Sequence, residues 1–155
     1  MVLEVVRNLL DEDINCASRR KSLIIVLGYD ARSKLESLKN YKDEPLTVNS
    51  ILRSRRDVHV LFLNSLQYIF MYLIKLEVQP DSHTHLVIYG LDSLINEMCQ
   101  EDSLDLNQVR AANLIFQTAY RVSRQNQLQE VLFIAYDQKK WDKLEPLRKY
   151  WQEVC

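Results

Sequence analysis

The chain contains four short runs of nearly continuous apolar residues, separated by longer stretches in which apolar positions recur with helical spacing. The four runs are Leu23–Leu27, Val58–Leu63, Leu86–Tyr89 and Val131–Tyr136. Each is rich in β-branched or aromatic residues, as strands are, and an unbroken apolar run indicates a strand covered on both faces. The pattern therefore predicts a buried, mostly parallel sheet of about four to five strands.

Helical patterns occupy the segments between and after these runs. They cover Ala31–Lys39, Val48–Arg55, Ser65–Val78, Leu106–Gln127 and residues 138–155, and a further helix is expected over residues 1–14. Strands that alternate with helices are typical of βαβ units joined by right-handed crossovers. The chain has no internal repeat and no linker-like segment, and its 155 residues suit one domain. We therefore expect residues 1–155 to form a single α/β domain with helices flanking the sheet.

Composition excludes several classes of function. Acidic and basic residues nearly balance, for a formal net charge of −1, which argues against a strongly basic nucleic-acid binder. The chain has 2 glycines, whereas an average usage of about 7% would give about eleven. The three cysteines form no CxxC pair, so they predict no disulfide framework and favour a reducing compartment. The longest apolar stretch, Tyr68–Ile74, is too short to span a membrane.

The first apolar run leads into the segment GYDARSKL, at the carboxyl end of a strand, where open α/β sheets bind ligands. A phosphate-binding loop reads G-x-x-x-x-G-K-[ST]. Gly28 and Lys34 occupy matching positions, but Ser33 replaces the second glycine and Leu35 replaces the Mg²⁺-binding hydroxyl residue. A side chain at position 33 obstructs the approach of the backbone to phosphate, and leucine cannot ligate a metal. We therefore expect a degenerate phosphate loop, no cofactor and no enzymatic activity.

The third apolar run continues as LVIYGLDSL. In P-loop ATPases such a strand ends in an acidic residue that orients Mg²⁺. Gly90 stands directly after the apolar residues, and Asp92 follows two positions later. Asp92 has two open interpretations: a metal-orienting acid if the strand extends to Leu91, or the N-cap of a following helix.

Two helical segments carry more apolar and aromatic surface than a small sheet requires. Helix 65–78 is apolar around its circumference, which predicts burial on all sides, either beneath other helices of the chain or against a partner. The C-terminal helix carries tryptophan and tyrosine, which are enriched in protein interfaces but can equally close the chain's own core. The partner-binding candidates are Tyr68, Phe70, Met71, Tyr72, Trp141, Leu144, Tyr150 and Trp151.

Histidine spacing gives no metal signature. His83 and His85 form an H-x-H pair without an acidic or cysteine companion at ligand spacing, and His59 lies within a predicted strand. We therefore predict no metal site.

Three small basic clusters accompany the strands: Arg19–Lys21, Arg53–Arg56 and Lys139–Lys140. The candidate DNA contacts are Arg53, Arg55 and Arg56, which could bind phosphates. The first two clusters precede strands and the third follows one, so a parallel sheet places them at opposite ends. One continuous nucleic-acid stripe is therefore not expected.

The order of these segments resembles the ATPase core of the eukaryotic type of RecA-like recombinases and their paralogues. The matching features are a strand ending in glycine, VHVLFL, a helix, LVIYGLDSL, a long helix and VLFIAYDQ. Asp137-Gln138 stands where that family has Asn-Gln, and LVIYGLDSL resembles the strand that ends in Asp-Ser. The segments VLGYDAR, VLFLNSLQYIFMYL, LVIYGLDSL and LRKYW resemble the small recombinase-paralogue-like subunit of the fungal Shu complex, from about Leu23 to Trp151.

This resemblance implies a minimal RecA-like, P-loop NTPase-type domain with an assembly role in place of catalysis. The implied partners are other recombinase-paralogue-like subunits and a SWIM-type zinc-binding subunit, with single-stranded or forked DNA reached through the complex in the nucleus. The implied function is to promote recombinase filament assembly in homologous recombination and error-free damage tolerance. Two alternatives remain open: a small nucleotide-binding ATPase using Gly28, Lys34 and Asp92, and a direct DNA-binding module using the arginine cluster.

Overall fold

A computed structural model describes residues 21–37, 54–98 and 103–155. The expected helix over residues 1–14, the Arg19-Arg20 pair and Arg53 lie outside these residues. The strands are β1 (Ser22–Leu27), β2 (Val58–Leu63), β3 (His85–Tyr89) and β4 (Glu130–Ile134). They form one sheet in the order β2-β1-β3-β4, and all three neighbouring pairs are parallel. The predicted α/β class and parallel sheet are confirmed.

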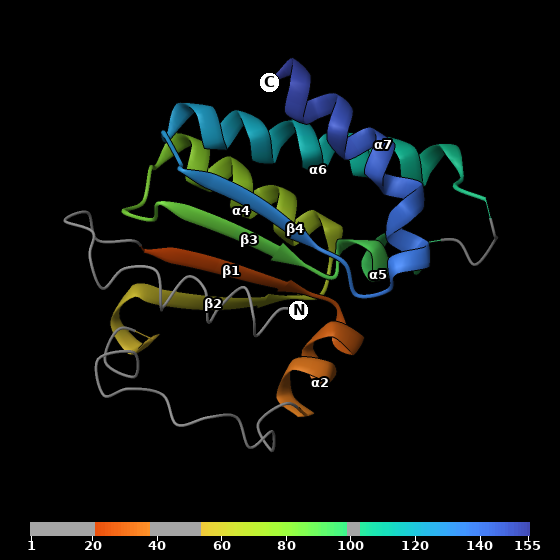
Figure 1. Cartoon of the computed structure of the whole chain (residues 1–155), viewed down its shortest axis with the longest axis horizontal. Coiled ribbons are helices and arrows are strands. Elements are labelled where there is room, and N and C mark those ends of the chain that lie inside the picture. The colour runs from red at the N-terminus through yellow and green to blue at the C-terminus, as the bar shows by residue number, and fades with distance from the viewer. Residues whose placement is uncertain (1–20, 38–53, 99–102) are drawn as a thin grey trace.

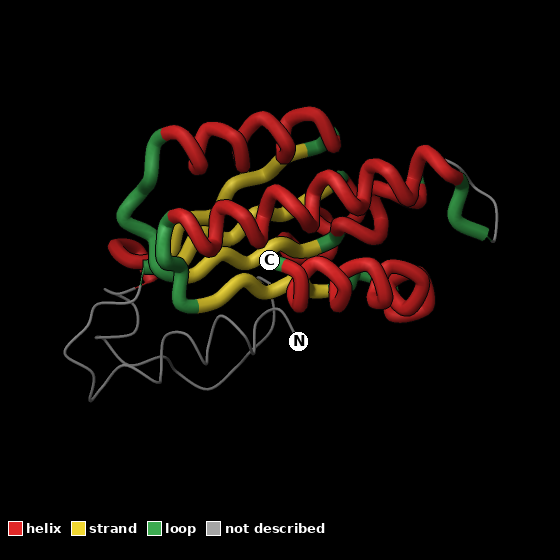
Figure 2. Tube along the Cα trace, turned by 90° about the horizontal axis from the view of Figure 1, so that it is seen from above, coloured by secondary structure: helices red, strands yellow, loops and turns green. Residues whose placement is uncertain are grey.

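Helices cover the two faces of the sheet unequally. The helices are α2 (Tyr29–Ser37), α4 (Leu66–Val78), α5 (Leu91–Asn96), α6 (Leu106–Gln125) and α7 (Gln138–Val154). In Figure 1, α4, α6 and α7 lie on one side of the sheet and α2 lies on the other. Figure 2 shows the larger group from above, with the helices side by side over the strands. This arrangement is a doubly wound sheet, whose order 2-1-3-4 reverses direction between β1 and β3.

Strand β1 runs through the centre of the protein and is buried at every residue. Its side chains alternate between the two faces, as the twofold period of a strand requires. Leu23, Ile25 and Leu27 join the large core beneath α4, α5, α6 and α7. Ile24 and Val26 join a smaller core on the face covered by α2. The run LIIVL is therefore apolar at every position because both faces of β1 are buried, as predicted.

Strand β2 departs from that prediction although its sequence, VHVLFL, is equally apolar. It lies at the edge of the described sheet, and only one of its faces is well covered. The register places Val60 beside Ile24 and Phe62 beside Val26, on the face of α2. Both side chains remain exposed, at 47% and 40%. The expectation that each apolar run is covered on both faces is confirmed for β1 and β3. β4, at the other edge, is partly buried, and among the described residues the prediction fails for β2.

Side-chain caps fix where the long helices begin. Ser65 accepts a hydrogen bond from the backbone N–H of Gln67 at the start of α4. Asp105 and Gln108 form a capping box at the start of α6, which satisfies two otherwise unpaired N–H groups. Gln108 also donates to the backbone oxygen of Ile95 at 3.0 Å, so that α6 is tied to α5. None of the described helices is both long and apolar enough to cross a membrane.

Candidate functional site

The carboxyl edge of the sheet is where a doubly wound fold binds its ligand, in the crevice beside the reversal of strand order. Here that place lies between the ends of β1 and β3, at Gly28 and Gly90. Both glycines have positive φ, at 81° and 86°, a conformation that side-chain-bearing residues rarely adopt. The N–H of Gly28 donates to Leu63 of β2, and that of Gly90 donates to Ile134 of β4. The two glycines thus turn the chain sharply while keeping the sheet paired.

The predicted phosphate loop is not a loop. Helix α2 begins at Tyr29, one residue after Gly28, so Ser33, Lys34 and Leu35 lie inside the helix. Their backbone groups therefore take part in a helix and cannot wrap around a phosphate, as the N–H groups of a P-loop do. Leu35 packs against the smaller core. The Lys34 ammonium lies 4.8 Å from the ring centroid of Tyr136, two residues after the end of β4. This is a cation–π contact.

Residues of the chain itself lie close around Gly90, between the ends of β1 and β3. A Cβ atom added to Gly90 would lie 2.7 Å from the Cβ of Ala31 and 2.7 Å from the backbone oxygen of Leu27. Ala31 is fully buried in the first turn of α2. Helix α2 therefore packs directly onto the turn at Gly90, and the close approach depends on the absence of a side chain there.

Asp92 is neither a metal-orienting acid at a strand end nor an N-cap. Strand β3 ends at Tyr89, Gly90 is the N-cap of α5, and Asp92 lies in the first turn of that helix. Its carboxylate is 1% exposed and accepts backbone N–H groups from Tyr136 at 3.0 Å and Asp137 at 2.7 Å. Asp92 thus fixes the segment that joins β4 to α7. The N-cap interpretation is wrong because α5 begins one residue before Asp92, and the strand does not extend to Leu91, as the metal-orienting interpretation required. The backbone partners of Asp92 lie more than forty residues away in the sequence, so no local pattern indicates them.

Tyr89 and Tyr136 meet beside this carboxylate. Their ring centroids are 6.5 Å apart. Burial, together with the nearby Tyr136 and Asp92, raises the pKa of Tyr89 to about 12. The Tyr89 hydroxyl therefore stays protonated at neutral pH.

Helix α7 divides the C-terminal partner candidates into two groups. Trp141 and Leu144 are buried in the large core, so they close the interior of this chain. Tyr150 is exposed, while Trp151 is half-buried and donates from its indole nitrogen to Asn113 at 2.8 Å. The alternative of core closure therefore applies to the first part of the helix, and its last turns retain exposed aromatic surface.

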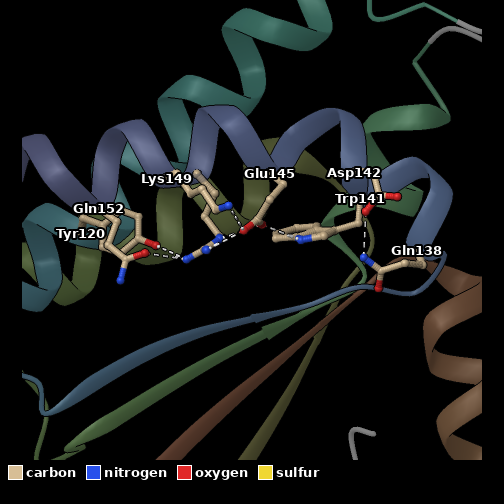
Figure 3. A network of polar contacts seen from close by, with 8 residues as sticks. Tyr120, Gln138, Trp141, Asp142, Glu145, Lys149 and Gln152 are labelled. Atoms are coloured by element: carbon tan, nitrogen blue, oxygen red, sulfur yellow. Dashed lines mark hydrogen bonds and ion pairs between the residues drawn. The ribbon is translucent and has the colours of Figure 1, made fainter.

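A polar network fixes the buried half of α7 (Figure 3). Arg148 holds the Glu145 carboxylate with two hydrogen bonds, at 2.9 and 2.7 Å, and the indole N–H of Trp141 donates to the same carboxylate at 2.8 Å. The hydrogen bond from Arg148 keeps the pKa of Glu145 below its ordinary value. Arg148 also reaches the hydroxyl of Tyr120 on α6, at 3.4 Å. The network orients Trp141 toward the core and joins α7 to α6.

Helix α4 presents apolar side chains to solvent. It buries Ile69, Leu73 and Leu76 against the sheet and α6. Tyr68, Met71 and Val78 are exposed, at 55%, 65% and 73%. The alternative in which other helices of the chain cover this helix on all sides is not met by the described residues, because one face is exposed. Burial of that face against a partner stays a prediction. The remaining candidates on α4, Phe70 and Tyr72, are partly buried against the core.

The exposed residues of α4 follow a regular spacing. Tyr68, Met71, Lys75 and Val78 are separated by three, four and three residues, so they form one stripe along the helix. We call these four residues the α4 stripe. Lys75 and Val78 were not among the sequence candidates, although the 3-4-3 spacing could have identified them.

The basic residues are dispersed. Arg55 and Arg56 are exposed in a helical turn over residues 54–57 that leads into β2, at the amino edge of the sheet. Lys21 directly precedes β1, at the same edge of the sheet, and its ammonium group donates to the Ser82 hydroxyl at 2.8 Å. Lys139 lies at the start of α7, toward the carboxyl edge. Arg55 and Arg56 thus lie at one end of the sheet and Lys139 toward the other, among the described residues of the three clusters.

A short histidine chain lies at the amino edge. His59 Nδ1 and His83 Nε2 are 2.9 Å apart, and His83 Nδ1 is 3.1 Å from a carboxylate oxygen of Asp81. We assign His83 as neutral, with its Nδ1–H facing Asp81 and Nε2 accepting from His59. Burial lowers the pKa of His83, with smaller opposing and supporting effects from Asp81, His59 and Lys21. Among residues 21–37, 54–98 and 103–155, no group of three or more ligand side chains could hold a metal ion.

The buried His83 predicts that stability falls in mild acid. Its pKa in the folded chain lies below the unfolded value of 6.5, so the unfolded chain binds the extra proton and stability is lost as the pH falls through 6.5. We expect the free energy of unfolding, measured by urea denaturation, to fall between pH 7.5 and pH 5. For one proton it should fall by no more than about 1.4 kcal/mol per pH unit. The His83→Gln variant should flatten this dependence. An equal slope in that variant would contradict the assignment.

The described residues form an α/β protein with a four-stranded parallel sheet, in which α2 packs onto the turn at Gly90 and α4 exposes large apolar side chains. Residues 3–155 match the family described as Suppressor of HU sensitivity involved in recombination protein 1, and the chain belongs to this Shu1 family. The protein of that description from Saccharomyces cerevisiae (strain ATCC 204508 / S288c) is 36% identical over 74 residues. The aligned segment covers 44% of this chain and 48% of that relative, about half the length of each.

Proposed function

We propose that the chain is a non-catalytic adaptor subunit of a Shu-type complex that promotes recombinase filament assembly on single-stranded DNA. Membership of a family involved in recombination supports the pathway. The observation that carries the adaptor role is the α4 stripe, because large apolar side chains gathered on one exposed helix face mark an interaction site.

The geometry of the carboxyl edge supports the non-catalytic part of the proposal. A nucleotide site of the P-loop kind needs a loop of free N–H groups and an acid that faces a metal. In this chain the corresponding residues lie inside α2, and the Asp92 carboxylate is engaged by two backbone N–H groups. The proposal describes the domain as a minimal RecA-like unit that has lost its nucleotide site, on the resemblance of its segments to that fold.

The proposed partners follow from the same resemblance. They are other recombinase-paralogue-like subunits and a SWIM-type zinc-binding subunit, with single-stranded or forked DNA reached through the complex in the nucleus. The near-neutral charge of the chain supports indirect contact with DNA, since strong autonomous binding needs a basic surface.

Two substitutions test the proposal in cells that lack the native copy. Lys34→Ala should leave growth on HU unchanged, because the Lys34 ammonium lies over the ring of Tyr136 and its segment forms helix α2 in place of a loop. Met71→Asp should abolish HU resistance, because it places a charge in the exposed apolar stripe. Protein levels and circular dichroism of both variants serve as controls.

The two arms separate the alternatives. Loss of HU resistance in Lys34→Ala at normal protein level would favour the nucleotide-binding alternative. Full HU resistance in a folded Met71→Asp variant would contradict an adaptor role for α4.

A further inference from the structure

The α4 stripe has the spacing of a helix–helix seam. Its 3-4-3 separation matches the a and d positions of a heptad, at which side chains of one helix insert between those of another. From Tyr68 to Val78 it extends about 15 Å along the helix axis. An extended segment has a different side-chain period, of two residues. The geometry therefore suits a partner helix that lies along α4.

Lys75 sets the charge that this partner must carry. It is exposed in the middle of the stripe, between Met71 and Val78. The neighbouring acid Glu77 is already held by Arg121, through contacts of 2.8 and 2.9 Å. The Lys75 ammonium lies 5.8 Å from the Tyr72 ring centroid, and no carboxylate of the described residues pairs with it. A helix packed over the stripe would bury this cation, which is costly unless a carboxylate faces it.

A second copy of the chain does not meet this requirement. Two α4 stripes packed in parallel about a twofold axis would place Lys75 against Lys75. Packed antiparallel, with Tyr68 opposite Val78, they would place Lys75 against Met71 of the other copy. Either arrangement buries two ammonium groups without a counter-ion.

The stripe is also too short to hold a free helical peptide. It offers four positions, about one and a half heptads, whereas a coiled coil is sustained over at least about three heptads. A helix that is already part of a folded surface does not incur the ordering cost of a disordered peptide.

We infer that the α4 stripe docks against a surface helix of a different, folded subunit, and that this helix carries apolar residues with an Asp or Glu facing Lys75. This inference rests on the proposed function and names the kind of partner surface for it.

The test is site-specific photo-crosslinking in cells with the full chain, followed by reciprocal charge reversal. A photoreactive phenylalanine analogue replaces Tyr68, and Tyr29, which is 78% exposed on the opposite side of the sheet, serves as the control position. The crosslink from position 68 should map to a helix with an acidic residue within one turn of the crosslinked site, and position 29 should not reach that helix. Lys75→Glu should then reduce recovery of that subunit about tenfold or more. Lys139→Glu, at an exposed lysine of α7, should not.

Charge reversal of the partner's acidic residue to lysine should restore recovery with Lys75→Glu. A crosslink to a second copy, to an extended segment or to nucleic acid would overturn the inference, as would unchanged recovery with Lys75→Glu. If the wild-type chain recovers no subunit at all, the proposed function fails as well. If it recovers subunits that Lys75→Glu still retains, only the assignment of α4 fails.

Discussion

The Gly90→Ala variant is expected to lose about 2–5 kcal/mol of unfolding free energy. Alanine at a positive φ costs about 1–2 kcal/mol, and φ at Gly90 is 86°. The added Cβ also meets the Ala31 Cβ and the Leu27 backbone oxygen at 2.7 Å, so either α2 or β1 must shift. Such overpacking costs a further 1–3 kcal/mol, roughly. Urea denaturation followed by circular dichroism measures the loss.

Gly28→Ala is the matched control for this variant. Its φ of 81° is nearly the same, but a Cβ there meets no atom closer than 3.6 Å, and that atom is the tip of the Glu97 side chain. We expect it to lose only the backbone cost of about 1–2 kcal/mol. Equal losses in the two variants would show that α2 does not pack against the turn at Gly90 and that the crevice is open.

The Asp92→Asn variant is expected to lose about 2–4 kcal/mol. The carboxylate accepts two backbone N–H groups, and hydrogen bonds to a charged group are stronger than neutral ones. An asparagine side chain can accept only one of them with its oxygen, so its amide group faces the second N–H and leaves it unsatisfied. A buried unsatisfied donor costs about 1–3 kcal/mol. The urea midpoint is again the readout.

Asp142→Asn is the control for this second variant, because Asp142 is exposed on α7 and its hydrogen bond to Gln138 lies at the surface. We expect a change within about 0.5 kcal/mol. A metal-orienting role for Asp92 makes a different prediction: Mg²⁺ with nucleotide would stabilise the wild-type chain and not Asp92→Asn. That result would contradict the structural role.

The central strands were predictable from the sequence because their environment is uniform. The runs that became β1 and β3 are apolar at every position, and both are buried on two faces. The run VHVLFL has the same character but became an edge strand. Strand order depends on contacts between distant segments, and the local pattern of β2 carries no information about which strands lie beside it. Its exposed Val60 and Phe62 could therefore not be foreseen.

The carboxyl edge was only half predictable, for the same physical reason. The substitutions at Ser33 and Leu35 indicated a degenerate phosphate loop, and the helical pattern predicted a helix over Ala31–Lys39. Neither showed that the helix begins at Tyr29, directly after Gly28. The residues ARSKLE are compatible with a helix, and α2 begins as soon as Gly28 has turned the chain. The role of Asp92 depends on the backbone of Tyr136 and Asp137, which no local motif reveals.

Residue type alone did not show which aromatic side chains of α4 and α7 are buried and which are exposed. Tyrosine and tryptophan suit both cores and interfaces. The Trp141 ring lies in the core, and its indole N–H donates to Glu145, which Arg148 holds in place. Tyr68 points outward because Ile69 and Leu73 occupy the buried side of α4. The helical period of α4 shows which residues share a face. Which face is buried depends on where the sheet lies, and the sequence of the helix does not give that position.

The central claim is that the chain acts by binding other subunits and not by nucleotide chemistry. Its most direct test is purification of the tagged full chain from native cells, with partners quantified by mass spectrometry. The proposal predicts comparable amounts of other recombinase-paralogue-like subunits and a SWIM-type zinc-binding protein. Recovery of the chain alone, together with saturable ATP binding by the purified protein, would contradict it.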